Sequence, residues 1–294
     1  MENPSKYPTQ LREYWEENYQ KFLNRPSRDS DWKLKAICYQ PWPLLFNRVM
    51  DFFERYYARD LMRRFAPSLE GKKVLDLGCG VGRWSRFFQR YGGEVVGVDL
   101  VWEVLVENRR QFSRPRFCNM AASDLGFKNE TFDFVSAPIV LQHIPPLEKA
   151  RALDEIYRVL KPGGAFFLLE TIARARKGDQ ETSWLLQEAE WREALESRGF
   201  EIVHQRPLHG YPLAALYSLL MLWLGKGVRR LKSKSLSSTG PKNPPEKVST
   251  RHTLYYHLNQ GALSLIALLS FPLEFLWVGL RLGGNHQMFL IKKS

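Results

Sequence analysis

The chain is predicted to fold as an α/β protein with a doubly wound, mostly parallel sheet, and two observations predict it. From residue 73 to residue 207, short apolar segments of strand length alternate with amphipathic segments of helix length. Glycine and proline separate these segments, as at Gly92 and Gly93 and at Pro162 to Gly164. Such alternation is typical of βαβ units, in which a helix connects two parallel strands.

The period of the apolar residues places each element. Residues 44–65 illustrate the helical case, because Val49, Phe53, Tyr57 and Leu61 recur at intervals of four. The expected helices cover residues 7–23, 44–65, 83–91, 101–112, 147–160 and 182–198. The expected strands cover residues 73–77, 94–98, 132–137, 165–170, 201–207 and 287–291, with another inside 115–119.

Three regions follow from this pattern. Residues 1–66 form an N-terminal helical lid or extension, and residues 67–208 together with 284–294 form the core, the α/β domain. Residues 209–283 form a hydrophobic helical insertion before the last strand. Within the insertion, 211–224 carry no charge and 258–280 are mostly apolar, whereas the linker 225–257 between them is rich in serine, proline and lysine.

The charge is concentrated in that linker. The chain has a formal net charge of +12, and residues 225–257 account for +7 of it. A local basic stretch indicates an anionic partner surface, either a membrane or a nucleic acid, or else a solvated linker. The three cysteines form no close pair, and the N-terminus has no apolar run. We therefore expect a cytoplasmic protein with no disulfide framework and no metal site.

A glycine-rich turn follows the first strand in residues 74–83 (VLDLGCGVGR). Glycines let the backbone approach a ligand closely, and the helix after them offers free N–H groups. The spacing is GxGxG, whereas dinucleotide sites use GxGxxG. Asp76 lies within the first strand and Asp99 ends the next, where a carboxylate can accept both hydroxyls of a ribose. The sequence therefore predicts a site for a nucleoside-containing cofactor.

Four segments together resemble the class I S-adenosylmethionine (SAM)-dependent methyltransferases, especially the group with quinone-biosynthesis and other small-molecule enzymes. They are residues 74–83, Val98 with Asp99, residues 124–133 (DLGF and TFD at its ends) and residues 155–164 (EIYRVLKPGG). The resemblance covers roughly residues 70–207 and the final strand. It implies a seven-stranded Rossmann-like methyltransferase fold whose last strand is antiparallel.

The resemblance also implies a role for each cofactor-binding residue. Gly78, Cys79 and Gly80 would pass under the methionine part of SAM, with Asp76 at its ammonium group and Arg83 at its carboxylate. Asp99, followed by Leu100, would hold the ribose. Ala122, Ser123 and Asp124 would read the adenine edge, and Pro138 would lie near the transferred methyl group. Many relatives have Asp or Asn where this chain has Ala121, so the adenine contact would shift to Asp124 or to the backbone.

Methyl transfer is an in-line displacement for which the protein mainly aligns the reactants. A hydroxyl or ammonium acceptor needs a general base, whereas a carboxylate acceptor does not. His143, in residues 140–144 (VLQHI) after the fourth strand, is the first candidate base. Its alternative role is a structural one, capping the next helix. Glu170, at the carboxyl end of the fifth strand, is the second candidate.

The insertion bears on the acceptor. It leaves the carboxyl end of a parallel strand, which is the ligand-binding edge of such a sheet. Residues 211–224 as a helix would span roughly 21 Å, too short for a hydrocarbon core of about 30 Å. We therefore expect interfacial helices and a peripheral enzyme on the inner face of an anionic membrane, acting on a hydrophobic or lipid-like molecule. The alternatives are a lid over a soluble substrate and a homodimer interface.

Other functions remain as rivals. An RNA or protein methyltransferase would explain the basic linker but not the apolar helices. A non-catalytic SAM-binding scaffold is disfavoured by the presence of both Asp76 and Asp99, and a dinucleotide oxidoreductase by the glycine spacing. Residues 136–139 (SAPI) lack the motif of amino-methylating DNA enzymes, so we expect no specific nucleic-acid partner.

Overall fold

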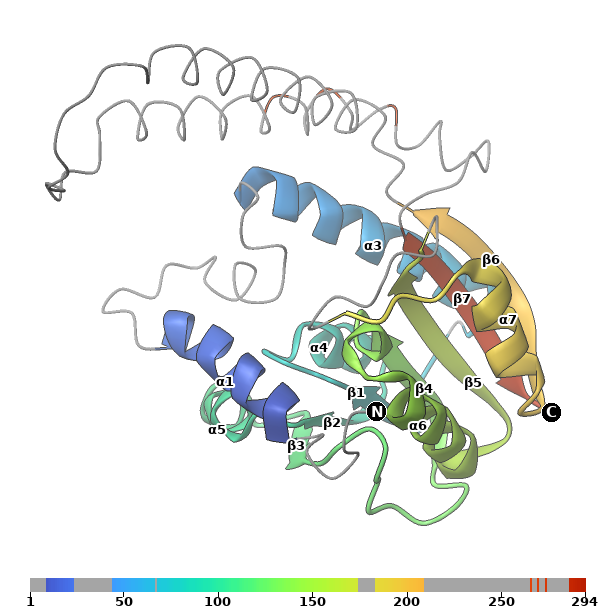
Figure 1. Ribbon diagram of the computed structural model, residues 1–294, viewed down its shortest axis with the longest axis horizontal. Helices are drawn as coiled ribbons and strands as arrows, with labels where there is room; N and C mark the ends of the chain where they lie inside the picture. Colours follow the sequence, from blue (N-terminus) through green and yellow to red (C-terminus); the bar gives the residue numbers. More distant parts are fainter. Residues whose placement is uncertain are drawn as a thin grey trace, which may run out of the picture.

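A seven-stranded sheet forms the centre of the computed structural model, which describes residues 9–23, 44–66, 68–173, 183–208 and 286–294 and positions 265, 269 and 273 (Figure 1). The strand order is β3-β2-β1-β4-β5-β7-β6. The strands are β1 (Lys73–Leu77), β2 (Glu94–Asp99), β3 (Arg116–Asn119), β4 (Phe132–Pro138), β5 (Leu160–Thr171), β6 (Phe200–Leu208) and β7 (His286–Lys293).

The first five strands pair in parallel, and β7 lies between β5 and β6, antiparallel to both. In the register, Ala165 of β5 faces Lys292 and Pro207 of β6 faces Gln287. The predicted doubly wound, mostly parallel sheet with an antiparallel last strand is therefore confirmed. Because parallel strands end at the same edge, the residues that follow β1, β2, β4 and β5 meet there.

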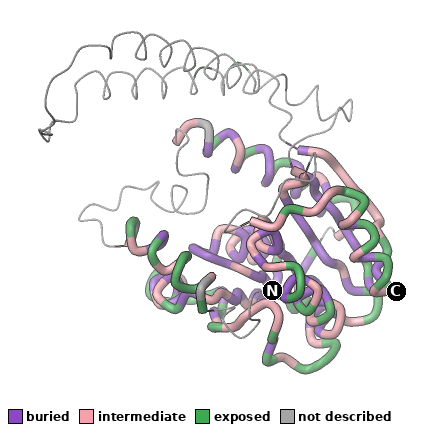
Figure 2. Tube along the Cα trace, viewed as in Figure 1, coloured by how far each residue is buried: buried purple, intermediate pink, exposed green. Residues whose placement is uncertain are grey.

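Helices cover both faces of the sheet. The described helices are α1 (Thr9–Leu23), α3 (Leu44–Phe65), α4 (Arg83–Gln89), α5 (Trp102–Gln111), the 3-10 turn η1 (Leu141–His143), α6 (Pro146–Val159) and α7 (Glu188–Glu196). On one face, Phe53 of α3 and Phe88 of α4 pack in one core cluster. On the other, Leu153 of α6 and Trp191 of α7 pack in a second. The buried residues follow this layering (Figure 2).

Two elements differ from expectation. The helix expected from residue 182 begins at Glu188, because Gln187 and Glu190 form a reciprocal capping box there. Trp184 instead donates its backbone N–H to the Gln142 carbonyl at 2.7 Å. The expected turn at residues 161–164 lies inside β5, which already begins at Leu160 opposite Phe132 and continues through a register shift.

The insertion expected at residues 209–283 lies outside the described residues, apart from Leu265, Leu269 and Leu273, which are helical and exposed. Of the N-terminal extension, α1 and α3 are described. Within the described part of the chain, no helix is both long enough and apolar enough to cross a bilayer.

Candidate cofactor and acceptor site

The glycine turn connects β1 to α4 and requires its glycines. Gly78, Gly80 and Gly82 have φ angles of +57°, +48° and +73°, which other residues rarely adopt. A Cβ built on Gly78 would lie 2.5 Å from Cγ2 of Val140, so the turn is also closed sterically. Between these glycines, Cys79 is buried and its N–H donates to the Val98 carbonyl at 2.9 Å. The backbone of the turn is thus fixed against β2.

Asp99 ties the end of β2 to this turn. Its Oδ2 accepts the Gly80 N–H at 2.8 Å, and its Oδ1 accepts the Val101 N–H at 3.0 Å. Burial raises the pKa of Asp99, and the backbone N–H groups of Val101, Gly80 and Leu100 oppose that rise. A carboxylate has about four acceptor positions. The acceptor capacity that remains after these bonds can receive a ligand hydroxyl.

Leu100 directly follows β2 and Pro138 ends β4, at the same edge of the sheet. The Asn119 side chain donates to the Asp99 and Leu100 carbonyls at 2.9 and 2.8 Å, which holds the end of β2. Pro138 is the last residue of β4 and is buried. Ile139 after it has a φ of +59°, a conformation that costs a non-glycine residue about 1–3 kcal/mol and is common at functional sites.

Asp76 lies beneath the turn and is fully buried. Its Oδ2 accepts the Ser85 hydroxyl and its Oδ1 accepts the Ser136 hydroxyl, each at 2.6 Å. Burial raises the pKa of Asp76 to about 6, although both hydroxyl bonds act to lower it. Asp76 therefore joins β1, α4 and β4 in the interior. A contact of Asp76 with the ammonium group of SAM, as the resemblance implies, would have to compete with these two hydrogen bonds.

Arg83, the first residue of α4, is held by carboxylates of α3. Its Nη1 lies 2.9 Å from Oδ1 of Asp51 and 2.7 Å from Oε2 of Glu54. Arg55 forms a second ion pair with Asp51. Asp51 and Glu54 are only 6% and 4% exposed. Together with the two guanidinium groups they form a nearly neutral cluster beside the glycine turn, in which the Arg55 side chain stays partly exposed.

The acidic half of this cluster was not among the predicted site residues. Asp51 and Glu54 lie three residues apart on the face of α3 that also buries Phe53 and Tyr57. Charged residues on a buried helix face are rare unless they are paired. That interruption of an apolar stripe was the available signal in the sequence.

Helix α1 covers the same edge of the sheet. Tyr19 is 7% exposed and packs in one cluster with Cys79 and Val81. Burial, together with the negative charge of Asp99, raises the pKa of Tyr19. Trp15, one turn earlier, meets the His143 ring edge to face at a centroid distance of 5.0 Å. Trp15 and Tyr19 were not among the predicted site residues.

His143 ends the 3-10 turn η1 and is half-buried. Its Nε2 lies 3.0 Å from Nε2 of Gln142. Gln142 is itself fixed, because its Oε1 accepts the Thr171 N–H at 3.3 Å. The structure therefore brings His143 together with the carboxyl edge of the sheet and with α1.

Glu170 lies beneath η1 and is fully buried. Its Oε1 accepts the N–H groups of Val140 and Leu141 at 3.2 and 2.7 Å, and its Oε2 accepts that of Gln142 at 3.2 Å. Burial raises the pKa of Glu170 to about 8, opposed chiefly by the positive charge of Lys149. Three backbone bonds and full burial make Glu170 the anchor of η1, so its position does not support the predicted role as a base.

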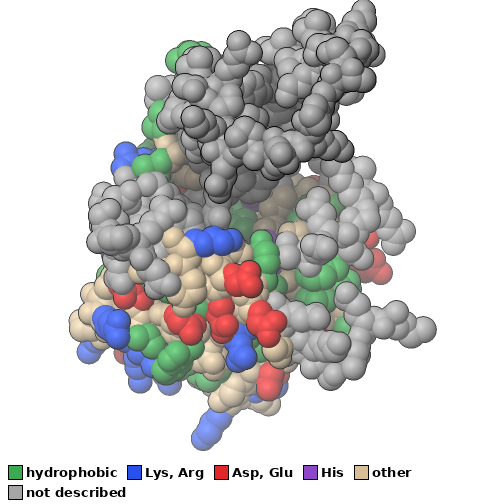
Figure 3. All heavy atoms as spheres, turned by 60° about the vertical axis from the view of Figure 1, so that its left-hand side comes forward, with side chains coloured by type: hydrophobic (Ala, Val, Ile, Leu, Met, Phe, Trp, Pro, Cys, Tyr) green, Lys and Arg blue, Asp and Glu red, His purple; other side chains and the backbone are tan. Residues whose placement is uncertain are grey.

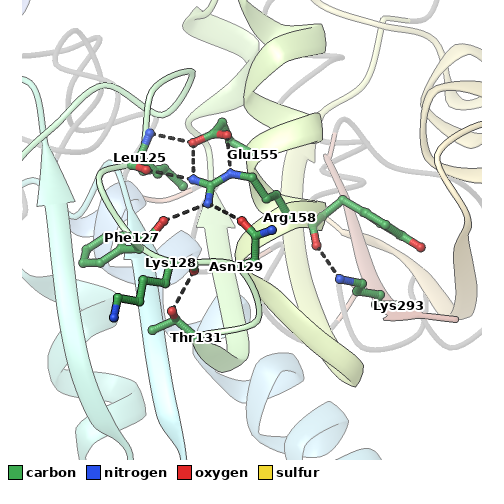
Figure 4. Close-up of polar contacts among 9 residues, drawn as sticks. Leu125, Phe127, Lys128, Asn129, Thr131, Glu155, Arg158 and Lys293 are labelled. Atoms are coloured by element: carbon green, nitrogen blue, oxygen red, sulfur yellow. Dashed lines mark hydrogen bonds and ion pairs between the residues drawn. The ribbon is translucent and has the colours of Figure 1, made fainter.

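The predicted adenine segment is a tight turn after β3. Asp124 donates its N–H to the Ala121 carbonyl at 3.2 Å, and the turn carries Ala122 and Ser123. The following loop is held by Arg158 of α6 (Figure 4), whose guanidinium donates to the Leu125 and Phe127 carbonyls at 2.8 Å.

Glu155 completes this anchor of the loop. It accepts the Leu125 N–H at 2.7 Å and pairs with the Arg158 guanidinium, which lowers the pKa of Glu155. The resembling segments 124–133 and 155–164 are thus one structural unit (Figure 4).

An acidic surface lies beside the site, between α1 and α5. Acidic side chains gather on this side of the molecule (Figure 3), and a shallow hollow of about 560 Å³ is lined by Glu13, Glu16, Glu17 and Glu103 with Gln20 and Lys21. None of the predicted cofactor residues lines it. The hollow is thus separate from the glycine turn.

The sheet order, the antiparallel β7, the glycine turn after β1 and the carboxylate at the end of β2 define a Rossmann-like domain whose geometry fits a nucleoside-containing cofactor. Residues 75–168 match the family described as a methyltransferase domain. Within these residues the chain is similar to SAM-dependent methyltransferases.

The alignments with similar proteins lie mainly within this domain. A malonyl-(acyl-carrier protein) O-methyltransferase of Pectobacterium atrosepticum is 30% identical over 144 residues, 47% of this chain and 56% of that protein. A demethylmenaquinone methyltransferase of Lactiplantibacillus plantarum is 37% identical over 107 residues, 33% of this chain and 44% of that protein. The chain thus spans about half the length of the curated relatives that it matches.

One solved structure aligns with nearly the whole chain. The cyclase SpnF is 17% identical, with a TM-score of 0.54, and the alignment covers 97% of this chain and 95% of that protein. At this identity the likeness shows the fold alone. The reaction has to be argued from the residues of the site.

Proposed function

We propose that this chain is a SAM-dependent methyltransferase that acts on a hydrophobic or lipid-like small molecule at a membrane surface. The observation that carries the cofactor assignment is the hydrogen bond of 2.8 Å between the Gly80 N–H and Asp99, in a turn that admits no side chain at Gly78. When bound, SAM supplies a methyl group that its sulfonium has already activated.

The residues of the site fit such a cofactor. Asp99 keeps acceptor positions for the ribose hydroxyls, and the Ala122–Asp124 turn offers backbone groups to the adenine edge. The amino-acid end is a zwitterion, and the nearly neutral cluster of Arg83, Arg55, Asp51 and Glu54 offers both signs of charge to it. Gly78, Cys79 and Gly80 would form the floor between these parts.

The acceptor would meet α1 and η1. Trp15 provides an apolar wall, and His143 provides a polar group next to it. A relative named demethylmenaquinone methyltransferase supports a hydrophobic acceptor here. The basic and apolar sequence of residues 209–283 supports the membrane surface, with residues 225–257 attracting anionic lipid.

Two measurements test this proposal. Calorimetric titration with S-adenosylhomocysteine (SAH) should give one site per chain, and titration with NAD should give none; binding of NAD alone would overturn the cofactor assignment. Co-sedimentation with vesicles of phosphatidylglycerol should retain the chain, and neutral phosphatidylcholine vesicles should retain less. If the fraction of the chain in the pellet were the same with and without vesicles, the membrane assignment would be overturned.

The alternative is a soluble small-molecule or protein-bound acceptor, with residues 209–283 acting as a lid or a homodimer interface. A relative named malonyl-(acyl-carrier protein) O-methyltransferase supports it. Absence of vesicle binding, together with a dimeric mass by light scattering, would favour this alternative.

A further inference from the structure

The segment that follows β4 is held by the end of β5. The N–H of Ile139 donates to the Leu169 carbonyl at 2.7 Å. The next three N–H groups, those of residues 140–142, all donate to Glu170. Its Oε1 accepts the first two at 3.2 and 2.7 Å, and its Oε2 accepts the third at 3.2 Å. Two successive residues of β5 thus bind four successive N–H groups.

Val140 lies between this carboxylate and the glycine turn. A Cβ built on Gly78 would lie 2.5 and 2.7 Å from the two terminal methyl carbons of Val140, so the Val140 side chain packs directly against the turn. The N–H of the same residue donates to Glu170. A shift of the Val140 backbone would therefore move the side chain that closes the space above Gly78.

We propose that Glu170 is a positioning residue for the cofactor. It holds the backbone of residues 140–142 so that Val140 stays packed against Gly78, and the shape of the glycine turn thereby depends on a carboxylate of β5. This inference rests on the proposed function, which places the cofactor at that turn. Glu170 acts through Val140 and not by contact with the ligand.

A carboxylate suits this task because both of its oxygens accept. Buried N–H groups need an acceptor, and the three that meet Glu170 use both oxygens. In Glu170→Gln one of these oxygens becomes an NH₂ group, which cannot accept, so at least one N–H loses its partner. The left-handed conformation of Ile139, with a φ of +59°, persists only while its surroundings hold it. The segment should therefore relax when an acceptor is lost.

Other contacts reach the same segment from different elements. The Gln142 carbonyl accepts the Trp184 N–H at 2.7 Å, and Trp15 of α1 meets the His143 ring at a centroid distance of 5.0 Å. A change at Glu170 could reach the site through these contacts as well. A test of the proposal has to separate the route through Val140 from the others.

Amide hydrogen exchange of the full chain tests the proposal without a ligand. In Glu170→Gln, exchange should rise roughly tenfold at residues 140–142 and also at Cys79 and Gly80, whose N–H groups are bonded to β2. The amides of β6 report global unfolding and should rise less. Faster exchange at residues 140–142 alone would overturn the proposal, because Glu170 would then hold only its own loop.

A second variant keeps the test decisive if Glu170→Gln does not fold. Val140→Ala retains every backbone bond to Glu170 and removes only the methyl groups that meet Gly78. Exchange should rise at Cys79 and Gly80 and stay the same at residues 141 and 142. Unchanged exchange at Cys79 and Gly80 would show that Val140 does not hold the turn.

The matched control is Glu196→Gln, the same chemical change in an exposed ion pair with Arg192 on α7. It should alter neither the exchange of the glycine turn nor the affinity for SAH. An effect as large as that of Glu170→Gln would mean that the loss of a negative charge, and not the position of Glu170, is responsible.

Titration with SAH then tests the route to the cofactor. Glu170→Gln should bind SAH roughly tenfold more weakly and Val140→Ala roughly fivefold more weakly, and the double variant roughly tenfold, because both changes act through one contact. A loss of roughly fiftyfold, the product of the two, would place Glu170 on a route that bypasses Val140. If the wild-type chain binds no SAH, the proposed function fails while the exchange result stands.

Discussion

Asp99 and Gly80, which lie 19 residues apart in the sequence, are joined by a hydrogen bond of 2.8 Å from the Gly80 N–H to Oδ2 of Asp99. The bond crosses from the end of β2 to the turn after β1, so a single carboxylate both shapes the glycine turn and faces the predicted ribose position. Binding of the cofactor and geometry of the turn should therefore depend on the same side chain.

Replacement of Asp99 by Ala should raise the dissociation constant of SAH roughly 10- to 100-fold. Loss of a hydrogen bond to a charged group costs about 1.5–3 kcal/mol, which corresponds to that range. The measurement is calorimetric titration. Asp154→Asn, which removes a charge from an exposed ion pair with Arg198, serves as the control. An affinity unchanged in Asp99→Ala would remove Asp99 from the cofactor site.

The Arg83 cluster should act only on the amino-acid end of the cofactor. The double variant Asp51→Asn, Glu54→Gln should bind SAH roughly tenfold more weakly, since both partners of Arg83 lose their charge. Binding of 5′-methylthioadenosine, which lacks the amino-acid end, should not change. Titration of both ligands provides the comparison.

Asp60→Asn is the matched control for this cluster, because Asp60 lies on the same helix but pairs with Arg206. It should leave both affinities unchanged. If the double variant lost the same factor of affinity for SAH and for 5′-methylthioadenosine, Asp51 and Glu54 would act on the fold and not on the ligand.

Arg158 should control the order of the loop after the adenine turn. Arg158→Lys keeps the charge but cannot reproduce a guanidinium that contacts Leu125, Phe127 and Glu155 together. Amide hydrogen exchange in residues 125–129 should rise by roughly tenfold, since about 1–1.5 kcal/mol of hydrogen bonding is lost. Arg192→Lys, in an exposed pair with Glu196, should have no such effect. Unchanged exchange in this loop would contradict the anchoring role.

Stability should fall as the pH rises from about 4 to about 6, and Asp76 is one cause. Its pKa is about 6 in the folded state and about 3.8 in the reference state, so the folded chain retains a proton that the unfolded chain has released. This difference amounts to at most about 3 kcal/mol. The Asn amide in Asp76→Asn can bond both hydroxyls. Chemical denaturation of this variant should therefore show a free energy of unfolding that falls less steeply with pH than that of the wild type. An identical pH dependence in the variant would exclude Asp76 as the source.

Local patterns explain why some of the site was predictable. Asp99 and the glycine turn lie in adjoining strand–turn–helix units, where spacing along the chain fixes position in the fold. The helix at Leu44–Phe65 and the strand at Lys73–Leu77 have the predicted bounds, because periodicity and terminal glycine or proline agreed there.

Partners brought together from distant segments were not predictable. Asp76 meets Ser136, and Trp15 meets His143, only after the sheet has assembled, and no local motif marks either pair. Glu170 illustrates the consequence: its place at the end of a strand predicted a base, but the three N–H groups that it binds are visible only in the fold.

Methyl transfer to a hydrophobic acceptor can be tested in a single incubation. The purified full chain is mixed with methyl-labelled SAM and an extract of its source cells, and the organic, aqueous, protein and nucleic-acid fractions are counted beside those of Asp99→Ala. We predict label in the organic fraction that depends on the wild-type chain. Label only in another fraction would contradict the acceptor assignment, and no label in any fraction, with SAH bound, would contradict the assignment as a methyltransferase.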